Sequence, residues 1–274
     1  MVKLSPIRSE KVWGYEDWIA STHPDGCQAE FKELVKDFPL LVKIIQANDT
    51  LSVQVHPDDE DAKRLEGENE RGKTECWYVL DAEENASLVY GLKKDYSKQE
   101  LVQAIKDNSL HQLLNQVKVK TGDFIFIPAG TVHAIGRGLR LLEVQQSCNI
   151  TYRLYDWGLH REVHIEKGTS VIKNKKRKEI SPLGTEFECD YFKIIKSNID
   201  SEKSVSYSVS ESGEYPELIF ITKGQGFIES ENLKSENFRF SFSKEDIFAL
   251  SRGEKINLIP SGNEKTEIIR IMSK

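Results

Sequence analysis

Hydrophobic and polar residues alternate along most of this chain in short runs, which is the pattern of β-strands. Residues two apart in a strand share a face, so alternation marks one buried face and one polar face. Turn-forming glycine, proline, asparagine and aspartate residues separate the runs. The predicted strands span residues 40–47, 51–56, 74–80, 87–90, 117–120, 124–127, 139–146 and 150–155. Many short strands with frequent turns predict a mainly β fold of the sandwich or jelly-roll type.

Two segments have helical spacing instead. Residues 28–38 place four apolar side chains on one stripe, and Pro39 ends the predicted helix. Ser97 and Glu100 have the spacing of a capping box, and apolar residues on one face follow them. Residues 97–115 are therefore predicted to form one or two helices inserted into a β domain.

Three segments in the second half of the chain repeat segments of the first half in the same order. The matched pairs are residues 42–48 with 192–198, 75–79 with 217–221, and 123–130 with 246–253. The shared order indicates a duplicated β domain. We predict a first domain at residues 1–178 and a related second domain at residues 179–274. The basic run at residues 173–178 is interpreted as a solvated linker between them.

The composition narrows the class of protein. The chain has 274 residues, of which 38% are hydrophobic and 30% charged, as in soluble globular proteins. No apolar run approaches the roughly 20 residues that span a bilayer, and residues 1–8 lack the apolar core of a signal peptide. The four cysteines have no metal-binding spacing, so we expect reduced thiols in a cytoplasmic protein. The net charge of −6 argues against nucleic acid or an anionic membrane as a partner.

Four polar side chains on the predicted strands have the chemistry of metal ligands. Gln54 and His56 are two apart and share one face of their strand, while the strand at residues 74–80 contributes Glu75. His133 follows an apolar strand and a Pro-Ala-Gly turn. One amide oxygen, two imidazoles and a carboxylate can hold a borderline divalent cation and leave one coordination position open. The pattern predicts a catalytic metal site rather than a structural one.

The second half has lost these ligands. At the offsets of the repeat, the positions of Gln54, His56 and His133 are occupied by Ser204, Ser206 and Ile256, and no histidine follows His164. The second domain is therefore predicted to bind neither metal nor substrate.

Other charged residues of the predicted strands are also candidates for the site. Glu143 interrupts an otherwise apolar face of its strand, where a carboxylate needs a partner or a function. Arg153 lies on another predicted strand, about twenty residues after His133. Glu143 and Arg153 are therefore interpreted either as functional residues or as an internal ion pair. His160 and His164 have the spacing of a zinc-binding helix but lack the accompanying glutamate, and we interpret them as a solvated helix start.

The segment from Gly122 to His133 fits the second cupin motif, although the asparagine expected later in that motif is Arg137 here. The first cupin motif is altered to Gln54-Val-His56, and its glutamate follows nineteen residues after His56. With these departures the chain resembles type I mannose-6-phosphate isomerase in its short bacterial form. The resembling segments are residues 13–18, 51–59, 72–78, 127–135, 142–147 and 149–157, within a likeness that covers most of residues 10–166.

This resemblance implies two cupin-type jelly rolls in tandem, with the helical insertion in the first and a ligand-less second. It implies an enzyme of carbohydrate metabolism that interconverts mannose 6-phosphate and fructose 6-phosphate through a cis-enediol. One Zn²⁺ per chain would be held by Gln54, His56, Glu75 and His133. The catalytic residues would be Arg153, Lys73 and Glu143, and the sugar phosphate would be bound by Ser52, Lys73 and Arg153. We expect burial and the metal's charge to lower the pKa of Lys73, which would suit it to proton transfer.

Two alternatives remain. An iron-dependent cupin oxygenase would use two histidines and one carboxylate, but Gln54 argues against it. A non-catalytic, sugar-phosphate-binding regulatory cupin would bind the same ligand without turnover. The sequence leaves open whether the protein is a monomer or a homodimer, and whether Lys73, Glu143 or a water molecule transfers the proton.

Overall fold

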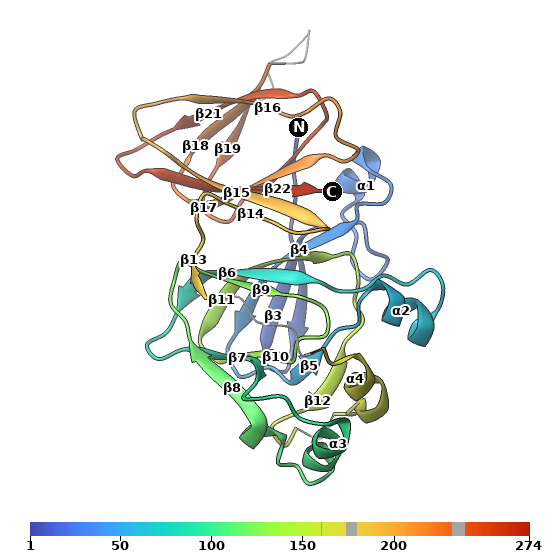
Figure 1. The fold of residues 1–274 in the computed structure, drawn as a ribbon. Coiled ribbons are helices and arrows are strands. Elements are labelled where there is room, and N and C mark those ends of the chain that lie inside the picture. The colour runs from blue at the N-terminus through green and yellow to red at the C-terminus, as the bar shows by residue number, and fades with distance from the viewer. Residues whose placement is uncertain (160, 174–179, 232–238) are drawn as a thin grey trace. The chain divides into compact units, whose positions relative to one another are not determined.

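A computed structural model describes residues 1–159, 161–173, 180–231 and 239–274 of the chain. It confirms the prediction of a mainly β protein, since most elements are strands arranged in four sheets (Figure 1). The chain forms two compact units. The first unit comprises Arg8–Trp18 and Leu40–Pro182, and the second comprises Met1–Ile7, Ile19–Pro39 and Leu183–Lys274.

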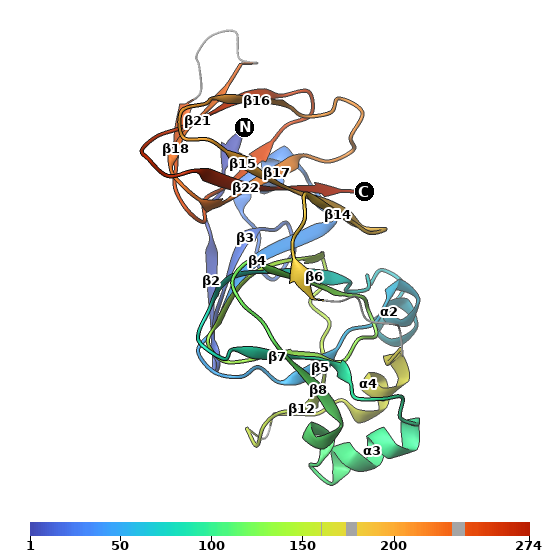
Figure 2. The same ribbon diagram turned by 60° about the vertical axis from the view of Figure 1, so that its left-hand side comes forward.

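Two antiparallel sheets make up the first unit. The seven-stranded sheet has the order β13 (Ser181–Pro182), β9 (Asp123–Ile127), β6 (Glu75–Ala82), β11 (Leu139–Gln146), β4 (Leu40–Ala47), β3 (Gly14–Ala20) and β2 (Ile7–Lys11). The five-stranded sheet has the order β12 (Tyr152–Tyr155), β5 (Val53–Val55), β10 (His133–Ile135), β7 (Ser87–Leu92) and β8 (Leu114–Lys118). Figure 2 shows β6 of the larger sheet and β7 of the smaller sheet on opposite sides of the unit.

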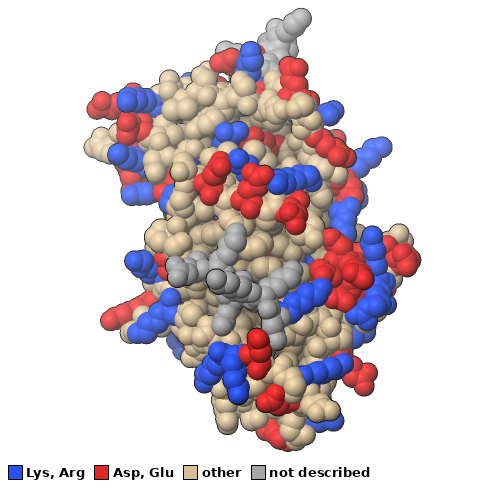
Figure 3. Space-filling view, in the orientation of Figure 1, with Lys and Arg blue, Asp and Glu red and all other residues tan. Residues whose placement is uncertain are grey.

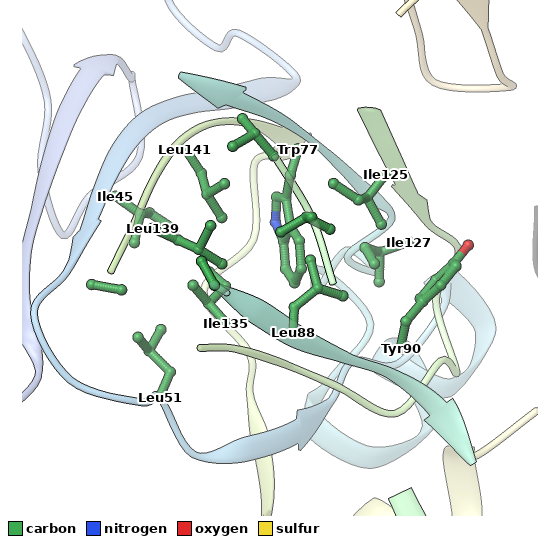
Figure 4. Close-up of a cluster of buried hydrophobic side chains, with 14 of the residues drawn as sticks. Ile45, Leu51, Trp77, Leu88, Tyr90, Ile125, Ile127, Ile135, Leu139 and Leu141 are labelled. Carbon is green, nitrogen blue, oxygen red and sulfur yellow. The ribbon is translucent and has the colours of Figure 1, made fainter. Parts of the chain in front are cut away.

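The apolar core of the first unit lies between these sheets. Trp77, Ile125 and Leu141 from the larger sheet meet Leu88 and Ile135 from the smaller one, and all are buried (Figure 4). This burial follows from the alternation along each strand, which sends every second side chain inward. Along β11 the inward face continues from its apolar residues to Glu143 and Gln145, so one end of the interior is polar.

Helices cover the outer face of the smaller sheet. Val53 and Val55 of β5 pack in one buried cluster with α3 (Lys98–Lys106), η1 (Leu110–Leu113) and α4 (Ile165–Val171). The predicted helical insertion at residues 97–115 is therefore present as α3 and η1. Its capping box is confirmed, because the Ser97 hydroxyl accepts from the Glu100 amide and the Glu100 carboxylate accepts from the Ser97 amide.

Two helices differ from the sequence prediction. The helix expected over residues 28–38 is shorter, since α1 spans only Ala29–Leu34 and the next residue is extended. The amide of Phe38 donates to Thr22 Oγ1 at 2.8 Å instead of continuing the helix. The helix α2 (Asp59–Glu66) was not predicted, and it begins where Asp58 accepts from the amide of Asp61.

The second unit also consists of two antiparallel sheets. One has the order β1 (Val2–Lys3), β20 (Ile247–Leu250), β17 (Glu217–Lys223), β22 (Thr266–Ser273), β15 (Phe192–Ile199) and β14 (Glu186–Glu188). The other has the order β16 (Val205–Ser208), β21 (Lys255–Pro260), β18 (Gly226–Ser230) and β19 (Arg239–Phe242). The strand order β20-β17-β22-β15 parallels β9-β6-β11-β4 of the first unit, and it contains the three segments that repeat in the sequence.

The division into units differs from the expected boundary between residues 178 and 179. That position, and most of the basic run at residues 173–178, lies outside the described residues. The N-terminal segments of the second unit were expected in the first domain. They belong to the second unit because β1 pairs with β20 and the ring of Phe38 packs on Tyr215.

Two further features concern the charged surface of the protein and the length of its helices. Lys, Arg, Asp and Glu side chains are interspersed over the face shown in Figure 3. Within the described ranges, no helix has both the length and the apolar character to cross a bilayer.

Candidate metal centre and adjoining cavity

Three predicted ligands meet between the two sheets of the first unit. His133 in β10 lies opposite Gln54 in β5, and Glu75 begins β6 of the facing sheet. The Glu75 carboxylate lies 3.3 Å from His133 Nε2 and 3.8 Å from His56 Nε2. One ligand atom from each of the three residues lies within 4.8 Å of the other two, and no side chain is more than 1% exposed. This spacing can hold a metal ion.

Both histidines are oriented by their other ring nitrogen. The Nδ1 of His56 donates to the carbonyl of Ile150, and the Nδ1 of His133 donates to the carbonyl of Thr131, each at 2.9 Å. A carbonyl only accepts, so these bonds fix the tautomer that leaves Nε2 with a lone pair. Backbone carbonyls orient metal-binding histidines in this way in many proteins.

Several atoms of the centre make no hydrogen bond among the described residues, although Glu75 Oε2 forms an ion pair with Lys73. His56 Nε2 and both carboxylate oxygens of Glu75 are buried without a hydrogen bond among the described residues. Each such group costs roughly 1–3 kcal/mol when left unsatisfied. Two imidazole nitrogens and a carboxylate fit a borderline divalent cation, so the residues present suit such an ion.

The protonation of the three groups agrees with that fit. Burial lowers the pKa of His133 to about 4 and that of His56 well below its ordinary value, so both rings are neutral near pH 7. Burial raises the pKa of Glu75 to about 7, although the charge of Lys73 opposes that rise. The site thus disfavours bare charge on Glu75, which a bound cation would offset.

Gln54 and Lys73 lie at the same centre. The amide nitrogen of Gln54 is 3.3 Å from His133 Nε2, so a half-turn of that amide would present its oxygen instead. Lys73 Nζ is 3.2 Å from Glu75 Oε2. The pKa of Lys73 is not lowered in the metal-free site, whereas the expectation also rested on the charge of a bound metal. Burial lowers that pKa, but the charges of Glu75 and Glu143 outweigh burial and raise it.

A cavity of about 250 Å³ adjoins the centre and brings the remaining predicted residues together. Ser52, Gln54, Lys73, Glu143 and Arg153 all line it. The lining also includes polar residues that were not predicted from the sequence, namely Lys11, Glu16, Lys43, Asn149, Thr151 and Arg161. Five basic and two acidic side chains therefore face the cavity. This basic cluster can attract an anion although the chain as a whole is acidic.

Arg153 is held at the edge of this cavity by its surroundings. It lies opposite Gln54 in the pairing of β12 with β5. Its Nη1 donates to the carbonyl of Glu162 at 2.8 Å, and its Nε lies 3.9 Å from Asp156. Nε is buried without a hydrogen bond within the described part of the chain.

Glu143 pairs with a residue other than Arg153. Its Oε2 accepts from the indole of Trp77 at 2.9 Å, and its Oε1 lies 3.4 Å from Lys43 Nζ. Lys43 also lies 3.6 Å from Glu16 and 5.1 Å from the ring of Trp18. The internal ion pair considered between Glu143 and Arg153 is thus formed with Lys43 instead. Lys43 carried the same sequence signal as Glu143, a charge within an apolar strand.

The histidine pair at residues 160 and 164 does not form a described metal site. His160 lies outside the described residues, and His164 Nδ1 accepts from the amide of Arg153 at 3.0 Å. His164 stands directly before α4, as the helix-start interpretation expects.

The fold and the site together define a class, namely mainly β proteins with a buried candidate metal centre beside a basic cavity. Comparisons with known proteins narrow this class. The family model of the phosphomannose isomerase type I catalytic domain matches residues 3–75. The mannose-6-phosphate isomerase of Streptococcus mutans is 43% identical over 200 residues, which is 60% of this chain and 62% of that protein. The mannose-6-phosphate isomerase ManA of Bacillus subtilis is 39% identical over 232 residues, which is 79% of this chain and 70% of that protein.

The fold agrees with these relatives. The crystal structure of the mannose 6-phosphate isomerase from Bacillus subtilis superposes with a TM-score of 0.80 at 27% identity, and the match covers 98% of each chain. The chain therefore belongs to the type I mannose-6-phosphate isomerase family, and the predicted family is confirmed. In sequence, the alignment spans less than two thirds of the length of the Streptococcus mutans relative.

Proposed function

We propose that the protein is a zinc-dependent aldose–ketose isomerase that interconverts mannose 6-phosphate and fructose 6-phosphate through a cis-enediol. The observation that carries this proposal is the buried His56–Glu75–His133 centre beside a cavity lined by five basic side chains. Several ligand atoms of this centre make no hydrogen bond within the described part of the chain. The relatives named above carry the same activity in their names.

One Zn²⁺ per chain is proposed to bind at Gln54, His56, Glu75 and His133. The neutral imidazoles and the lone carboxylate suit zinc, and the amide of Gln54 adds a weak fourth ligand. A zinc ion bound there would act as a Lewis acid toward the sugar oxygens without changing its redox state.

The side chains around the cavity are assigned complementary roles. Arg153 offers fixed donors to the negative charge that develops on the enediol oxygens. Lys73 lines the cavity with Ser52 and lies 3.2 Å from Glu75, so we assign it with Ser52 to holding the substrate and to proton transfer near the metal. Glu143 lines the cavity, and its Oε1 makes no hydrogen bond among the described residues although Lys43 Nζ lies 3.4 Å from it. We assign to Glu143 the proton that moves between C1 and C2.

We further propose that both units are cupin-type jelly rolls produced by duplication. The parallel strand orders of the two units support this origin. The second unit is proposed to bind neither metal nor substrate, because Ser204, Ser206 and Ile256 stand at the matched ligand positions. We propose a cytoplasmic location as well, supported by the four free cysteines.

A comparison of substrates tests this function. The zinc-loaded protein should form fructose 6-phosphate from mannose 6-phosphate, and unphosphorylated mannose should react far more slowly because it cannot use the basic cluster. The variant His133→Ala provides the control without a metal centre. Oxygen uptake by an iron-loaded protein would indicate a cupin oxygenase, and tight sugar-phosphate binding without turnover would indicate a regulatory protein. Either outcome would overturn the proposal.

A further inference from the structure

The first unit contains a second cavity that shares no lining residue with the metal-centre cavity. Its volume is about 340 Å³, within the range of roughly 300–1,000 Å³ that small-molecule sites occupy. The loop between β6 and β7, the loop between β10 and β11, and the turn after β12 provide most of its wall. Nothing in the proposed isomerisation uses this cavity.

The chemistry of the wall is that of a site for a polyhydroxylated ring. Trp157 contributes an indole, and Glu84, Gln116 and Arg137 contribute planar groups that donate or accept hydrogen bonds. Within the described residues these three side chains make no hydrogen bond or ion pair of their own, so they are available to a ligand. Apolar residues, including Val89, complete the wall. A pyranose ring has apolar faces and a hydroxylated edge, and this wall offers a complement to both.

Trp157 is held in an uncommon conformation at this cavity. Its φ is 51°, in the left-handed region that a bulky side chain rarely adopts. Its indole Nε1 donates to the carbonyl of Leu51 at 2.8 Å, and its ring stands edge-on to Tyr155 with centroids 5.0 Å apart. Residues in such conformations persist where the surroundings fix them, and they cluster at ligand-binding sites.

The charge of the second cavity indicates a ligand of a different kind from the sugar phosphate. Its lining carries the carboxylates of Glu83 and Glu84 against the single cation of Arg137, whereas basic side chains outnumber acidic ones in the metal-centre cavity. A phosphate dianion would therefore be repelled here and attracted there. We propose that the second cavity binds an uncharged sugar, with one pyranose ring against Trp157. This site is additional to the proposed isomerase site.

The NMR signals of the tryptophan indoles can report on ligand binding in the two cavities separately. The chain has four tryptophans, of which Trp157 lines the second cavity and Trp13 lines the metal-centre cavity. The variant Trp157→Phe assigns the first signal by removing it. Methyl α-D-mannoside, which is uncharged and cannot open its ring, should shift the Trp157 signal of the zinc-loaded protein saturably. Mannose 6-phosphate should shift the Trp13 signal. An unshifted Trp157 signal at the solubility limit of the mannoside would overturn the inference.

Variants of exposed residues that line the second cavity test whether the mannoside binds there. Gln116→Ala and Glu84→Ala each remove one hydrogen-bonding group, and each should raise the Kd of the mannoside by about fivefold, the effect of one lost hydrogen bond. Glu68→Gln alters an exposed acidic residue that lines neither cavity, so its Kd should equal that of the unmodified protein. Isomerase activity should be unchanged in all three variants. An unchanged Kd in both lining variants would place the sugar elsewhere and refute the proposed site.

Discussion

Glu143 and Lys43 form a buried ion pair beside the metal centre. They lie opposite each other in the pairing of β11 with β4, and neither is more than 3% exposed. Each charge would be costly alone in this interior, so each offsets part of the cost of burying the other. Trp77 completes the arrangement by donating to the second oxygen of Glu143. The pair therefore fixes the carboxylate that we assign to proton transfer.

Removing only the cation of this pair should be costly. Lys43→Met leaves Glu143 buried without its ion-pair partner, so we expect a loss of about 3–5 kcal/mol in the free energy of unfolding, together with a fall in kcat. Chemical denaturation measures the first effect. The double variant Lys43→Met/Glu143→Gln is the control, because removing both charges should restore most of the stability but not the activity. Equal stability of the single variant and the unmodified protein would show that the pair is unimportant.

Variants of Arg153 distinguish a role in catalysis from a role in substrate binding. A guanidinium that stabilises the developing enediolate interacts most strongly in the transition state, so Arg153→Ala should lower kcat by roughly 10²–10³ with little change in KM. Arg153→Lys keeps the charge without the planar fork and should restore only part of the rate. Steady-state kinetics with bound zinc measured in parallel checks this. A steep rise in KM at unchanged kcat would instead assign Arg153 to the phosphate.

Some residues of the candidate site could be predicted from the sequence, and others could not. The metal-centre residues His56, Glu75 and His133 could be predicted because short motifs on alternating strands bring them to one face. Lys11 and Arg161 could not, because they reach the cavity only through the folding of segments far apart in the chain. The raised pKa of Lys73 was also unpredictable, since it depends on carboxylates whose distances the sequence does not give.

At the scale of elements, central strands were predicted better than helices. The strands β4 and β11 have the predicted bounds, because both are long apolar runs in the middle of a sheet. The first helix ended earlier than predicted, since the position before Pro39 disfavours helical backbone and Phe38 bonds to Thr22. The helix α2 has one fully buried residue, Ala62, so its apolar stripe was too weak to recognise.

The capping box of α3 gives an element-scale prediction. Ser97 is exposed, and its hydroxyl satisfies an amide in the first turn of α3, which packs on the outer face of the smaller sheet. Ser97→Ala should lower the free energy of unfolding by about 1 kcal/mol. Ser97→Asp retains a side-chain acceptor and should restore most of that loss. Thermal and chemical denaturation would measure both variants. No difference between alanine and aspartate would mean that the cap contributes nothing to stability.

At the scale of the whole molecule, the repeat in the sequence has a counterpart in the topology. Each of the three matched segments of the first unit, in β4, β6 and β9, corresponds to the strand at the same place in the sheet order of the second unit. The repeat could be recognised because the matched strands are buried and share an apolar pattern. The place of the N-terminal segments in the second unit could not be predicted. Pairing of strands that lie more than 240 residues apart leaves no local pattern in the sequence.

The metal centre also sets how the stability of the metal-free protein depends on pH. The pKa of His56 and of His133 lies below the ordinary 6.5, so between about pH 6.5 and 4.5 the unfolded chain binds two protons there that the folded chain does not. Glu75, with a folded pKa of about 7 against an ordinary 4.5, binds one extra proton in the folded chain over the same window. Two minus one leaves one proton, so stability should fall by up to about 1.4 kcal/mol per pH unit as the pH drops.

Denaturation of the chelated protein at several pH values in this window measures that slope. His133→Gln removes one of the two histidines, so the remaining proton difference is near zero and the profile should flatten. An equally steep profile in that variant would assign the pH dependence to groups outside the metal centre.

The most direct test of the central claim couples metal occupancy to turnover. The protein is stripped with a chelator and titrated with Zn²⁺, while fructose 6-phosphate formation and bound metal are measured in the same samples. Activity should rise in proportion to bound zinc until one ion is bound per chain and then stay constant, and His133→Ala should neither retain zinc nor regain activity. Full turnover by the stripped protein, or activity that does not follow occupancy, would contradict the account.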